Sequence, residues 1–368
     1  MHLKHLNILQ YKNISESNFE LAAKVNCFLG NNGAGKTTVL DAIYYLAFCK
    51  SFFSPIDSQN IQHDQDFFMI DGRFELDGGE EKIYCGQKRN EKKKFKRNQK
   101  EYDRLSDHIG TIPLVMIAPS DTDLIREGSD ARRKFMDGII SQYNKAYLET
   151  LMQYNRLLAQ RNAMLKHFWV EGRKMDPTAF EVFDEQLHAC GTEIFKERNR
   201  FLEGYLPIFS NFYELISGGA EQVDIAYESH LTEKSLNDWL KECRQNDFRA
   251  QYTTKGVHKD DLLFSIAGHP MKKYGSQGQQ KSFVIALRLA QFDYLKELKK
   301  RKPILLLDDI FDKLDDTRVA ALMKLVSEDH FGQIFITDAN LHRVPDLFKD
   351  ENVPLKKFLV EFGTIKDL

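Results

Sequence analysis

The stretch Lys24–Phe48, KVNCFLGNNGAGKTTVLDAIYYLAF, decides the fold. It opens with a short strand candidate, Lys24–Leu29, and apolar residues then recur at helical spacing from Val39 to Ala47. Between the two, Gly30–Thr37 fits the pattern G-x-x-x-x-G-K-[ST]. Strand, glycine-rich loop and helix in this order predict a loop whose backbone N–H groups hold phosphate at the helix N-terminus.

The residue types of this loop suit a nucleoside triphosphate. Glycines let the backbone curl around phosphate oxygens without clashes from Cβ atoms. We expect the Lys36 ammonium to reach the β- and γ-phosphates and the Thr37 hydroxyl to ligate Mg²⁺. A chance glycine turn is the alternative, which the flanking strand and helix disfavour. The candidate nucleotide-binding residues are Gly30, Asn31, Asn32, Gly33, Ala34, Gly35, Lys36, Thr37 and Thr38.

A second buried strand supplies carboxylates. Ile304–Leu307 is wholly apolar and is followed by Asp308 and Asp309. Ligands of open α/β sheets lie at the carboxyl ends of strands, so we expect Asp308 to hold Mg²⁺ through water. We expect Asp309 to orient or activate the attacking water. An acidic surface turn is the alternative. Because about 270 residues separate Lys36 from this strand, a large insertion must divide the nucleotide-binding domain.

The insertion has the pattern of a helical hairpin. Apolar residues recur at helical spacing over Met136–Phe168 and again over Phe183–Phe212, and the polar turn Glu171–Pro177 joins the two stripes. This arrangement predicts two long antiparallel helices. The segment Phe67–Ile117 is β-rich, with a turn at residues 77–79. The last third of the chain alternates strands with helices, as in a parallel or mixed sheet.

The segment Tyr274–Lys281, YGSQGQQK, precedes the helix that leads to the Ile304 strand. Serine, glycines and glutamines at the start of a helix form a cup of N–H and O–H donors that suits an anion. Taken alone, the segment reads equally well as a polar helix N-cap. Its place just upstream of the Asp308 strand is where ABC-type ATPases carry their signature motif.

These motifs together resemble the RecF family of recombination-repair proteins, relatives of the SMC-type ATPases. The resemblance implies an α/β fold, an ABC/SMC-type ATPase head of the P-loop class with a mixed sheet, an antiparallel β subdomain and an inserted helical-hairpin lobe. The implied division is 1–125 for the first part of the head, 126–215 for the hairpin and 216–368 for the remainder of the head. The segments that carry the resemblance are Tyr11–Asn13, Gly30–Thr37, Ala42–Leu46, Lys50–Phe52, Ala118–Asp121, Gly256–Leu262, Ser276–Gln280 and Leu307–Asp309.

The resemblance also implies roles for single residues. Asp315 looks like the D-loop aspartate of a dimer interface, and Thr337 stands near the place where many ABC proteins carry a switch histidine. Many ABC proteins use glutamate to position water, and Asp309 is shorter by one methylene. We therefore predict weak, slow ATP hydrolysis, with ATP serving as a dimerisation switch. Residues implied to contact nucleotide are Lys12 and Asn13 and, acting on the γ-phosphate bound by a second copy, Ser276, Gln277, Gly278 and Gln279.

Candidate DNA-binding residues come from local charge, because the net charge is only −2. The densest basic run is Lys88–Lys100, and a second cluster lies near the start of the hairpin. Lysine and arginine there would contact phosphates without sequence preference. A solvated hairpin face and a helix cap paired with acids are the alternatives. The candidates are Lys92, Lys93, Lys94, Lys96, Arg97, Arg132 and Arg133.

The resemblance implies a function in DNA replication, repair and the SOS response. An ATP-dependent homodimer would close on duplex DNA near single-strand gaps and, beside RecR and RecO, help load the RecA recombinase. An SMC-type head that partners a nuclease is the main alternative, although it would need a longer coiled coil. A transporter nucleotide-binding subunit and an ATP-gated defence nuclease fit less well. No apolar run is long enough to cross a bilayer and no signal peptide is evident, so we expect a cytoplasmic protein with five reduced cysteines.

Overall fold

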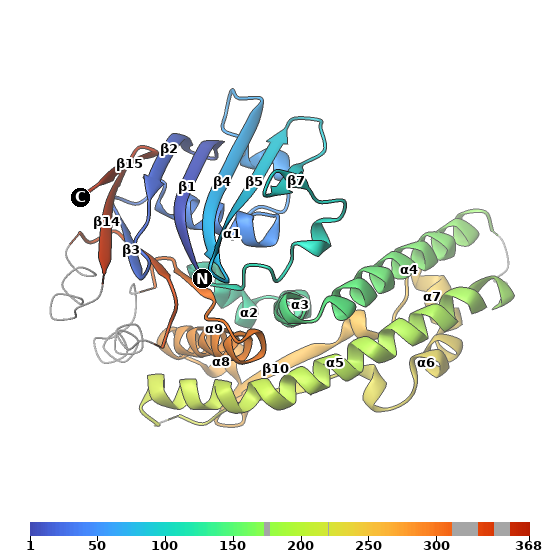
Figure 1. Ribbon diagram of the computed structural model, residues 1–368. Helices are drawn as coiled ribbons and strands as arrows, with labels where there is room; N and C mark the ends of the chain where they lie inside the picture. Colours follow the sequence, from blue (N-terminus) through green and yellow to red (C-terminus); the bar gives the residue numbers. More distant parts are fainter. Residues whose placement is uncertain (173–176, 220, 311–329, 342–353) are drawn as a thin grey trace. The chain divides into compact units, whose positions relative to one another are not determined.

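The computed structural model describes residues 1–172, 177–219, 221–310, 330–341 and 354–368 (Figure 1). The chain divides into two compact units. Unit 1 comprises 1–121, 212–219 and 281–368, and unit 2 comprises 122–211 and 220–280. The expected segment 216–368 is therefore divided, because residues 221–280 fall in the same unit as most of the helical hairpin. Ser276–Gln279 accordingly belong to unit 2.

Unit 1 contains a six-stranded sheet in the order β15-β14-β3-β13-β12-β8. All neighbouring pairs are parallel except β14 with β15. Every residue of β3, β8, β12 and β13 is buried, as expected for parallel strands that are covered on both faces. The strands are β3 (Val25–Leu29), β8 (Leu114–Ile117), β12 (Ile304–Leu307), β13 (Ile334–Asp338), β14 (Leu355–Glu361) and β15 (Thr364–Asp367).

A second six-stranded sheet of unit 1 is antiparallel, in the order β2-β1-β4-β5-β6-β7. Strand β1 carries a bulge between Leu3 and His5. The bulge brings Leu3 onto the same buried side of the sheet as Leu6 and Ile8. Simple alternation would place Leu3 on the opposite side. The strands are β1 (His2–Tyr11), β2 (Ile14–Glu20), β4 (Phe67–Leu76), β5 (Gly79–Lys88), β6 (Lys94–Arg97) and β7 (Lys100–Glu101).

One apolar core joins the elements of unit 1. Helix α1 (Lys36–Phe48) contributes ten buried residues, and its apolar side chains share a cluster with those of both sheets. At the centre, the ring of Phe28 stacks on that of Phe358, with centroids 4.8 Å apart. This packing fixes the helix that follows the phosphate loop, so the loop is held at both of its ends.

Unit 2 is built from long helices and a small sheet. The first predicted helix is broken at Asn144, whose side chain caps the next helix by accepting from the Tyr147 N–H. The three-stranded sheet has the order β11-β10-β9. The elements are α2 (Asp123–Arg126), α3 (Ser129–Tyr143), α4 (Lys145–Val170), α5 (Pro177–Ser217), α6 (Leu236–Glu242), α7 (Arg244–Ala250), α8 (Met271–Tyr274), β9 (Val223–Glu228), β10 (Asp261–Ile266) and β11 (His269–Pro270). The end of α5, from residue 212, belongs to unit 1.

Two further features complete the chain. Helix α9 (Gln277–Lys299) begins in unit 2 and continues in unit 1. Short 3₁₀ helices lie at Asp57–Asn60, Leu105–Asp107, Pro119–Thr122, His230–Thr232 and Val257–Lys259.

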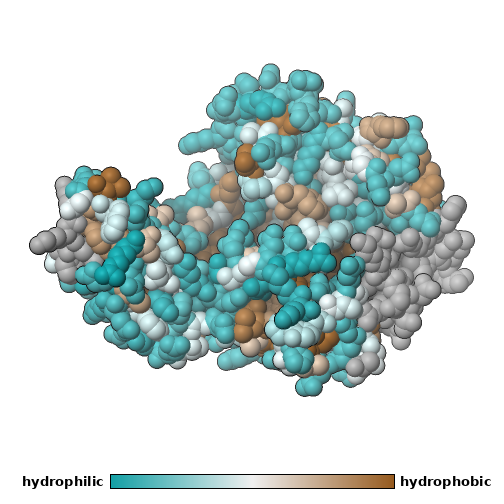
Figure 2. All heavy atoms as spheres, turned by 180° about the vertical axis from the view of Figure 1, so that it is seen from behind, coloured by the Kyte–Doolittle hydropathy of each residue, from teal (hydrophilic) through white to brown (hydrophobic). Residues whose placement is uncertain are grey.

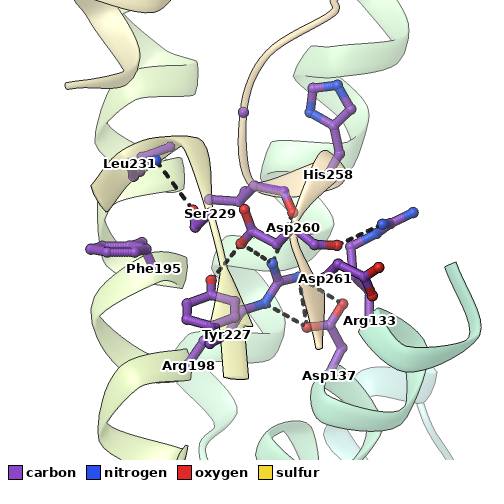
Figure 3. A network of polar contacts seen from close by, with 12 residues as sticks. Arg133, Asp137, Phe195, Arg198, Tyr227, Ser229, Leu231, His258, Asp260 and Asp261 are labelled. Carbon is purple, nitrogen blue, oxygen red and sulfur yellow. Dashed lines mark hydrogen bonds and ion pairs between the residues drawn. The ribbon is translucent and has the colours of Figure 1, made fainter. Parts of the chain in front are cut away.

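A buried ionic network holds unit 2 together (Figure 3). The Arg198 guanidinium, 2% exposed, donates to Asp260 at 2.6 Å, to Asp137 at 3.0 Å and to the Val257 carbonyl at 2.8 Å. Tyr227 donates its hydroxyl to the same Asp260 carboxylate at 2.5 Å. The segment 256–262 that supports the family resemblance is thus joined to α3, α5 and β9. Removing one partner of such a network leaves a buried charge unpaired, at a typical cost of about 3–5 kcal/mol.

Hydrophilic residues predominate on the face of the molecule in Figure 2, where apolar residues form small separate groups. Among the helices that the structure describes, none has the length and apolar character that a membrane span requires.

Candidate nucleotide-binding site

The phosphate loop adopts backbone conformations that glycine favours. Gly30, Gly33 and Gly35 have φ angles of 153°, 80° and 116°. A Cβ atom on Gly30 would lie 2.2 Å from the Val360 carbonyl oxygen, and one on Gly35 would lie 3.2 Å from Asn13 Nδ2. The close approach excludes a Cβ atom at Gly30, and the positive φ angles favour glycine at both ends of the loop.

Lys36 is buried at the start of α1 and points back along the loop. Its ammonium donates to the carbonyls of Gly30 at 2.8 Å and Asn31 at 3.1 Å. The loop surrounds a hollow of about 400 Å³. The residues lining the hollow are Lys12, Asn13, Asn32, Gly33, Gly35, Lys36, Thr37, Thr38 and Asp309. The structure thus brings together the predicted phosphate loop and the acid predicted to position water.

Asp308 occupies the carboxyl end of β12, beside the loop. The Thr37 hydroxyl lies 2.9 and 3.0 Å from its two carboxylate oxygens, and the Thr337 hydroxyl donates to it at 2.8 Å. Burial raises the pKa of Asp308, and the two threonine hydrogen bonds partly counter that shift. Thr337 in turn accepts from the Asp309 N–H at 2.9 Å. Thr337 thus holds the Asp308 carboxylate and the backbone of Asp309.

The Thr37 and Asp308 oxygens fit a divalent cation. Magnesium prefers hard oxygen ligands and is usually held by one or two carboxylates together with substrate phosphates. A buried carboxylate whose pKa is raised by desolvation gains from a nearby cation. These two residues would hold Mg²⁺, which would neutralise phosphate charge when bound.

Lys12 and Asn13, which are predicted to contact nucleotide, also line the hollow. Asn13 accepts from the Thr38 hydroxyl at 2.6 Å and donates to the Gly33 carbonyl at 3.2 Å. The Lys12 ammonium lies 2.6 Å from the fully buried carboxylate of Asp41. Asn13 therefore ties the β1–β2 turn to the phosphate loop, and Lys12 adds a cation to the wall of the hollow.

The turn between β14 and β15 supports the loop from outside, which sequence reasoning missed. The Gly363 N–H donates to the Ala34 carbonyl at 2.8 Å. Gly363 has φ of 77°, and a Cβ atom there would lie 2.1 Å from the Asn13 carbonyl oxygen. A glycine between two strand-like segments signals a tight turn, but no local pattern names the loop that it supports.

The signature segment forms a capping box at the start of α9 in unit 2. The Gln279 N–H donates to Ser276 Oγ at 3.2 Å, and the Ser276 N–H donates to Gln279 Oε1 at 2.7 Å. Ser276 and Gln277 are exposed, and Gly278 is partly exposed. The predicted D-loop residue Asp315 lies outside the described residues.

The basic candidates in the β5–β6 region divide into exposed and internally paired residues. Lys92 and Lys94 are exposed, and Lys96 lies over the ring of Tyr84. Lys93, only 10% exposed, donates to Asp57 at 2.7 Å and to the Cys49 carbonyl at 2.6 Å. Arg97 pairs with Glu81. The expectation of phosphate contacts is therefore corrected for Lys93, whose charge is used inside unit 1.

The arginines near the start of the hairpin are also used internally. Arg132 is buried and donates to both carboxylate oxygens of Asp261, at 2.6 and 2.9 Å, and to the Leu124 carbonyl. Arg133 donates to the Asp260 carbonyl at 2.8 Å. Their assignment to DNA is likewise corrected, because both guanidinium groups hold α3 against the segment that begins β10.

Comparison with known proteins agrees with this site. The RecF/RecN/SMC N terminal domain family matches residues 2–349. Proteins named DNA replication and repair protein RecF from Phocaeicola vulgatus and Flavobacterium johnsoniae are each 51% identical to this chain. The alignments cover 100% and 97% of this chain and 98% and 99% of those relatives.

Solved structures extend the agreement to the fold. The recombination mediator protein RecF-ATP of the RecFOR pathway is 31% identical with a TM-score of 0.89, covering 100% of this chain and 97% of that one. The RecF-ATPrS structure is 30% identical with a TM-score of 0.88, covering 100% and 98%. An Smc head from Pyrococcus furiosus, 16% identical with a TM-score of 0.57 over 100% and 96%, shares the fold alone. The chain belongs to the RecF family of DNA replication and repair proteins, and it has the ABC/SMC-type ATPase fold.

Proposed function

We propose that this member of the RecF family binds ATP with Mg²⁺, dimerises on the nucleotide and closes on DNA near single-strand gaps. The observation that carries the proposal is the Thr37–Asp308 pair beside the phosphate loop. It supplies a hydroxyl and a carboxylate at the same edge of the sheet where Lys36 faces the hollow. The relatives with solved structures are named as ATP forms in the RecFOR pathway, which supports the same function.

We infer weak hydrolysis from the acid that would position water. Asp309 lines the hollow, and its backbone N–H is fixed by Thr337. Its side chain is one methylene shorter than the glutamate of many ABC proteins, so the carboxylate reaches less far toward the γ-phosphate. We expect turnover below about one per second, at the lower limit of ordinary enzymes. Sustained hydrolysis at many turnovers per second would contradict a role as a dimerisation switch.

The proposed dimer uses the signature segment in trans. Ser276 and Gln277 are exposed at the N-terminus of α9, where helix N–H groups attract anions. The Ser276 hydroxyl accepts from the Gln279 N–H, so its own proton stays available to a phosphate oxygen. Gly278 and Gln279 would complete the cup, and Asp315 stays a predicted interface residue. Each ATP would thus contact both copies.

Sizing by light scattering, with and without Mg-ATP, tests the shared site. We expect wild type to dimerise with ATP and Ser276→Arg to stay monomeric, because the long cation fills the cup. Ser210→Arg is the matched control, since Ser210 is an exposed helical serine of the same unit. ATP-dependent dimers of Ser276→Arg that match those of wild type would refute the shared site.

For DNA we propose the exposed lysines of the β5–β6 region, Lys92 and Lys94, together with Lys96. Cooperation with RecR and RecO, RecA loading and a part in SOS induction follow from family membership and remain proposals. So does a cytoplasmic location, which is supported by five cysteines that are all free and buried. The alternative of an SMC-type head that partners a nuclease has less support, because RecF relatives match over the full length.

A further inference from the structure

The side chain of Gln279 is hydrogen-bonded at both ends of its amide. Its Oε1 accepts from the Ser276 N–H at 2.7 Å, and its Nε2 donates to Glu221 Oε1 at 3.1 Å. Glu221 lies two residues before β9, and all three residues belong to unit 2. The orientation of the amide is therefore fixed by two partners on different segments.

The first of these bonds covers a donor that an anion would need. Helix N-termini bind phosphate through backbone N–H groups that have no partner within the helix. Here the Ser276 N–H is already satisfied by the glutamine carbonyl, and the Gln279 N–H by Ser276 Oγ. A phosphate that approaches this cap must displace the Gln279 side chain to reach the Ser276 N–H.

The second bond holds that cover in place. A capping box needs only the serine and the glutamine, so the bond to Glu221 is an additional restraint. It also places a carboxylate one amide group away from the Ser276 N–H. Glu221 is only partly exposed, so solvent and salt weaken its field less than that of a fully exposed acid. An arriving phosphate therefore meets both a tethered side chain and a like charge.

We propose that Glu221 is a positioning residue that holds the Gln279 side chain over the Ser276 N–H at the N-terminus of α9. Glu221 thereby raises the ATP concentration needed for dimerisation. The inference rests on the proposed role of Ser276–Gln279 in trans. In this arrangement the free protein satisfies its own cap, and nucleotide on a second copy must release Gln279 from Glu221. Glu221 therefore sets the nucleotide threshold of the switch without contributing to the phosphate loop of its own chain.

Two substitutions at Glu221 separate the carboxylate charge from the hydrogen bond. Glu221→Gln keeps an acceptor for Gln279 and removes the charge, and Glu221→Ala removes both. We expect the ATP concentration for half-maximal dimerisation to fall about threefold to tenfold in Glu221→Gln and at least as far in Glu221→Ala. The change in Glu221→Gln should shrink as salt rises, because screening already weakens the charge in wild type. Glu228→Gln, an exposed glutamate of β9, is the matched control and should leave the threshold unchanged.

The readouts distinguish the possible failures. Binding of fluorescent ATP to monomers at low protein concentration should be equal in all variants, because Glu221 and the phosphate loop belong to different units. An unchanged or higher threshold in Glu221→Gln, with wild type dimerising and Ser276→Arg not, would overturn the inference alone. Absence of ATP-dependent dimers in wild type would instead overturn the proposed function on which it rests. Since Glu221→Gln is nearly isosteric, it keeps the test valid if Glu221→Ala is poorly folded.

Discussion

The Thr37 hydroxyl lies within 3.0 Å of both carboxylate oxygens of Asp308, although 271 positions separate the two residues in the chain. The parallel order of β3, β13 and β12 produces this proximity, because the carboxyl ends of the three strands meet at one edge. Thr37 follows β3 through the phosphate loop, and Asp308 follows β12 directly. The candidate metal site is therefore a property of the sheet and not of either motif alone.

Replacing Asp308 with asparagine should separate metal binding from stability. The amide keeps an acceptor for Thr37 and Thr337 but carries no buried charge, so we expect the free energy of unfolding to stay the same or rise by up to about 1 kcal/mol. We expect the tighter ATP binding that Mg²⁺ confers to disappear. Urea unfolding and calorimetric titration with and without Mg²⁺ measure the two effects. Asp64→Asn, at an exposed turn, is the control. If ATP affinity still depended on Mg²⁺ in Asp308→Asn, Asp308 would not be the metal ligand.

Gly363→Ala should destabilise the phosphate loop, although Gly363 is distant from the loop in sequence. The new methyl group would lie 2.1 Å from the Asn13 carbonyl oxygen, and the residue already has φ of 77°. Gly78→Ala has a similar φ of 81° with nothing within 4 Å, so it reports the backbone strain alone, about 1–2 kcal/mol. We expect Gly363→Ala to lower the free energy of unfolding by at least about 2 kcal/mol more than this control, and to weaken ATP binding. Equal losses in the two variants would show that the backbone near Asn13 relaxes freely.

The exposed lysines of the β5–β6 region should contribute to the salt dependence of DNA affinity. We expect Lys92→Ala combined with Lys94→Ala to reduce the slope of log affinity against log salt by about two, because each lysine would neutralise one phosphate. Lys366→Ala, another exposed lysine of unit 1, is the control. Fluorescence anisotropy at several salt concentrations measures the slopes. An equal slope change in Lys366→Ala would show that Lys92 and Lys94 do not form a specific DNA-binding site.

Lys93 should behave differently from its neighbours in the same basic run. We expect Lys93→Ala to destabilise the fold by about 1–3 kcal/mol, since the partly buried Asp57 carboxylate loses its cationic partner and keeps only the Tyr45 hydroxyl among the contacts described. Urea unfolding measures this effect, with Lys92→Ala as the exposed control. A Lys93→Ala variant as stable as wild type, with a reduced salt slope for DNA, would return this lysine to the DNA surface.

Stability should fall as the pH drops below about 6.5, partly because of His258. Burial lowers the pKa of His258 to about 4 from an ordinary 6.5. The unfolded chain therefore binds more protons than the folded one between these values, and acidification favours unfolding by up to about 1.4 kcal/mol per pH unit. His108 acts with the same sign, since burial also lowers its pKa to about 4. The buried Asp308 opposes the trend at lower pH because its pKa is raised.

The contribution of His258 to the pH dependence of stability can be isolated from the slope of unfolding free energy against pH. We expect His258→Gln to show a shallower dependence of unfolding free energy on pH between about 6.5 and 5, whatever its absolute stability. Urea unfolding at several pH values measures both slopes, with His63→Gln, at an exposed position, as the control. Identical slopes in wild type and His258→Gln would show that His258 is protonated without penalty.

Local sequence was sufficient for the parts of the fold with a strong pattern. The phosphate loop, the strand before Asp308 and the long helix α5 follow from short-range spacing, and the structure confirms these elements. The other predicted long helix is divided into α3 and α4 at Asn144. Two supports of the site, Thr337 and Gly363, were not predicted, because their partners lie far away along the chain and no periodicity reveals such pairing. The same limit explains Lys93 and Arg132, since their charge suggested DNA whereas the fold supplies internal carboxylates to both.

The strand that leads into the phosphate loop pairs with two strands that follow it far along the chain. β3 pairs with β13 and β14, which are made about 300 residues after it, a delay of roughly 15–60 s at ordinary rates of translation. Throughout that interval a five-residue strand, apolar except for Asn26, has two unpaired edges. Such segments recruit chaperones or aggregate. Correct folding of the head should therefore depend on keeping β3 from pairing with other segments until β13 and β14 have been synthesised.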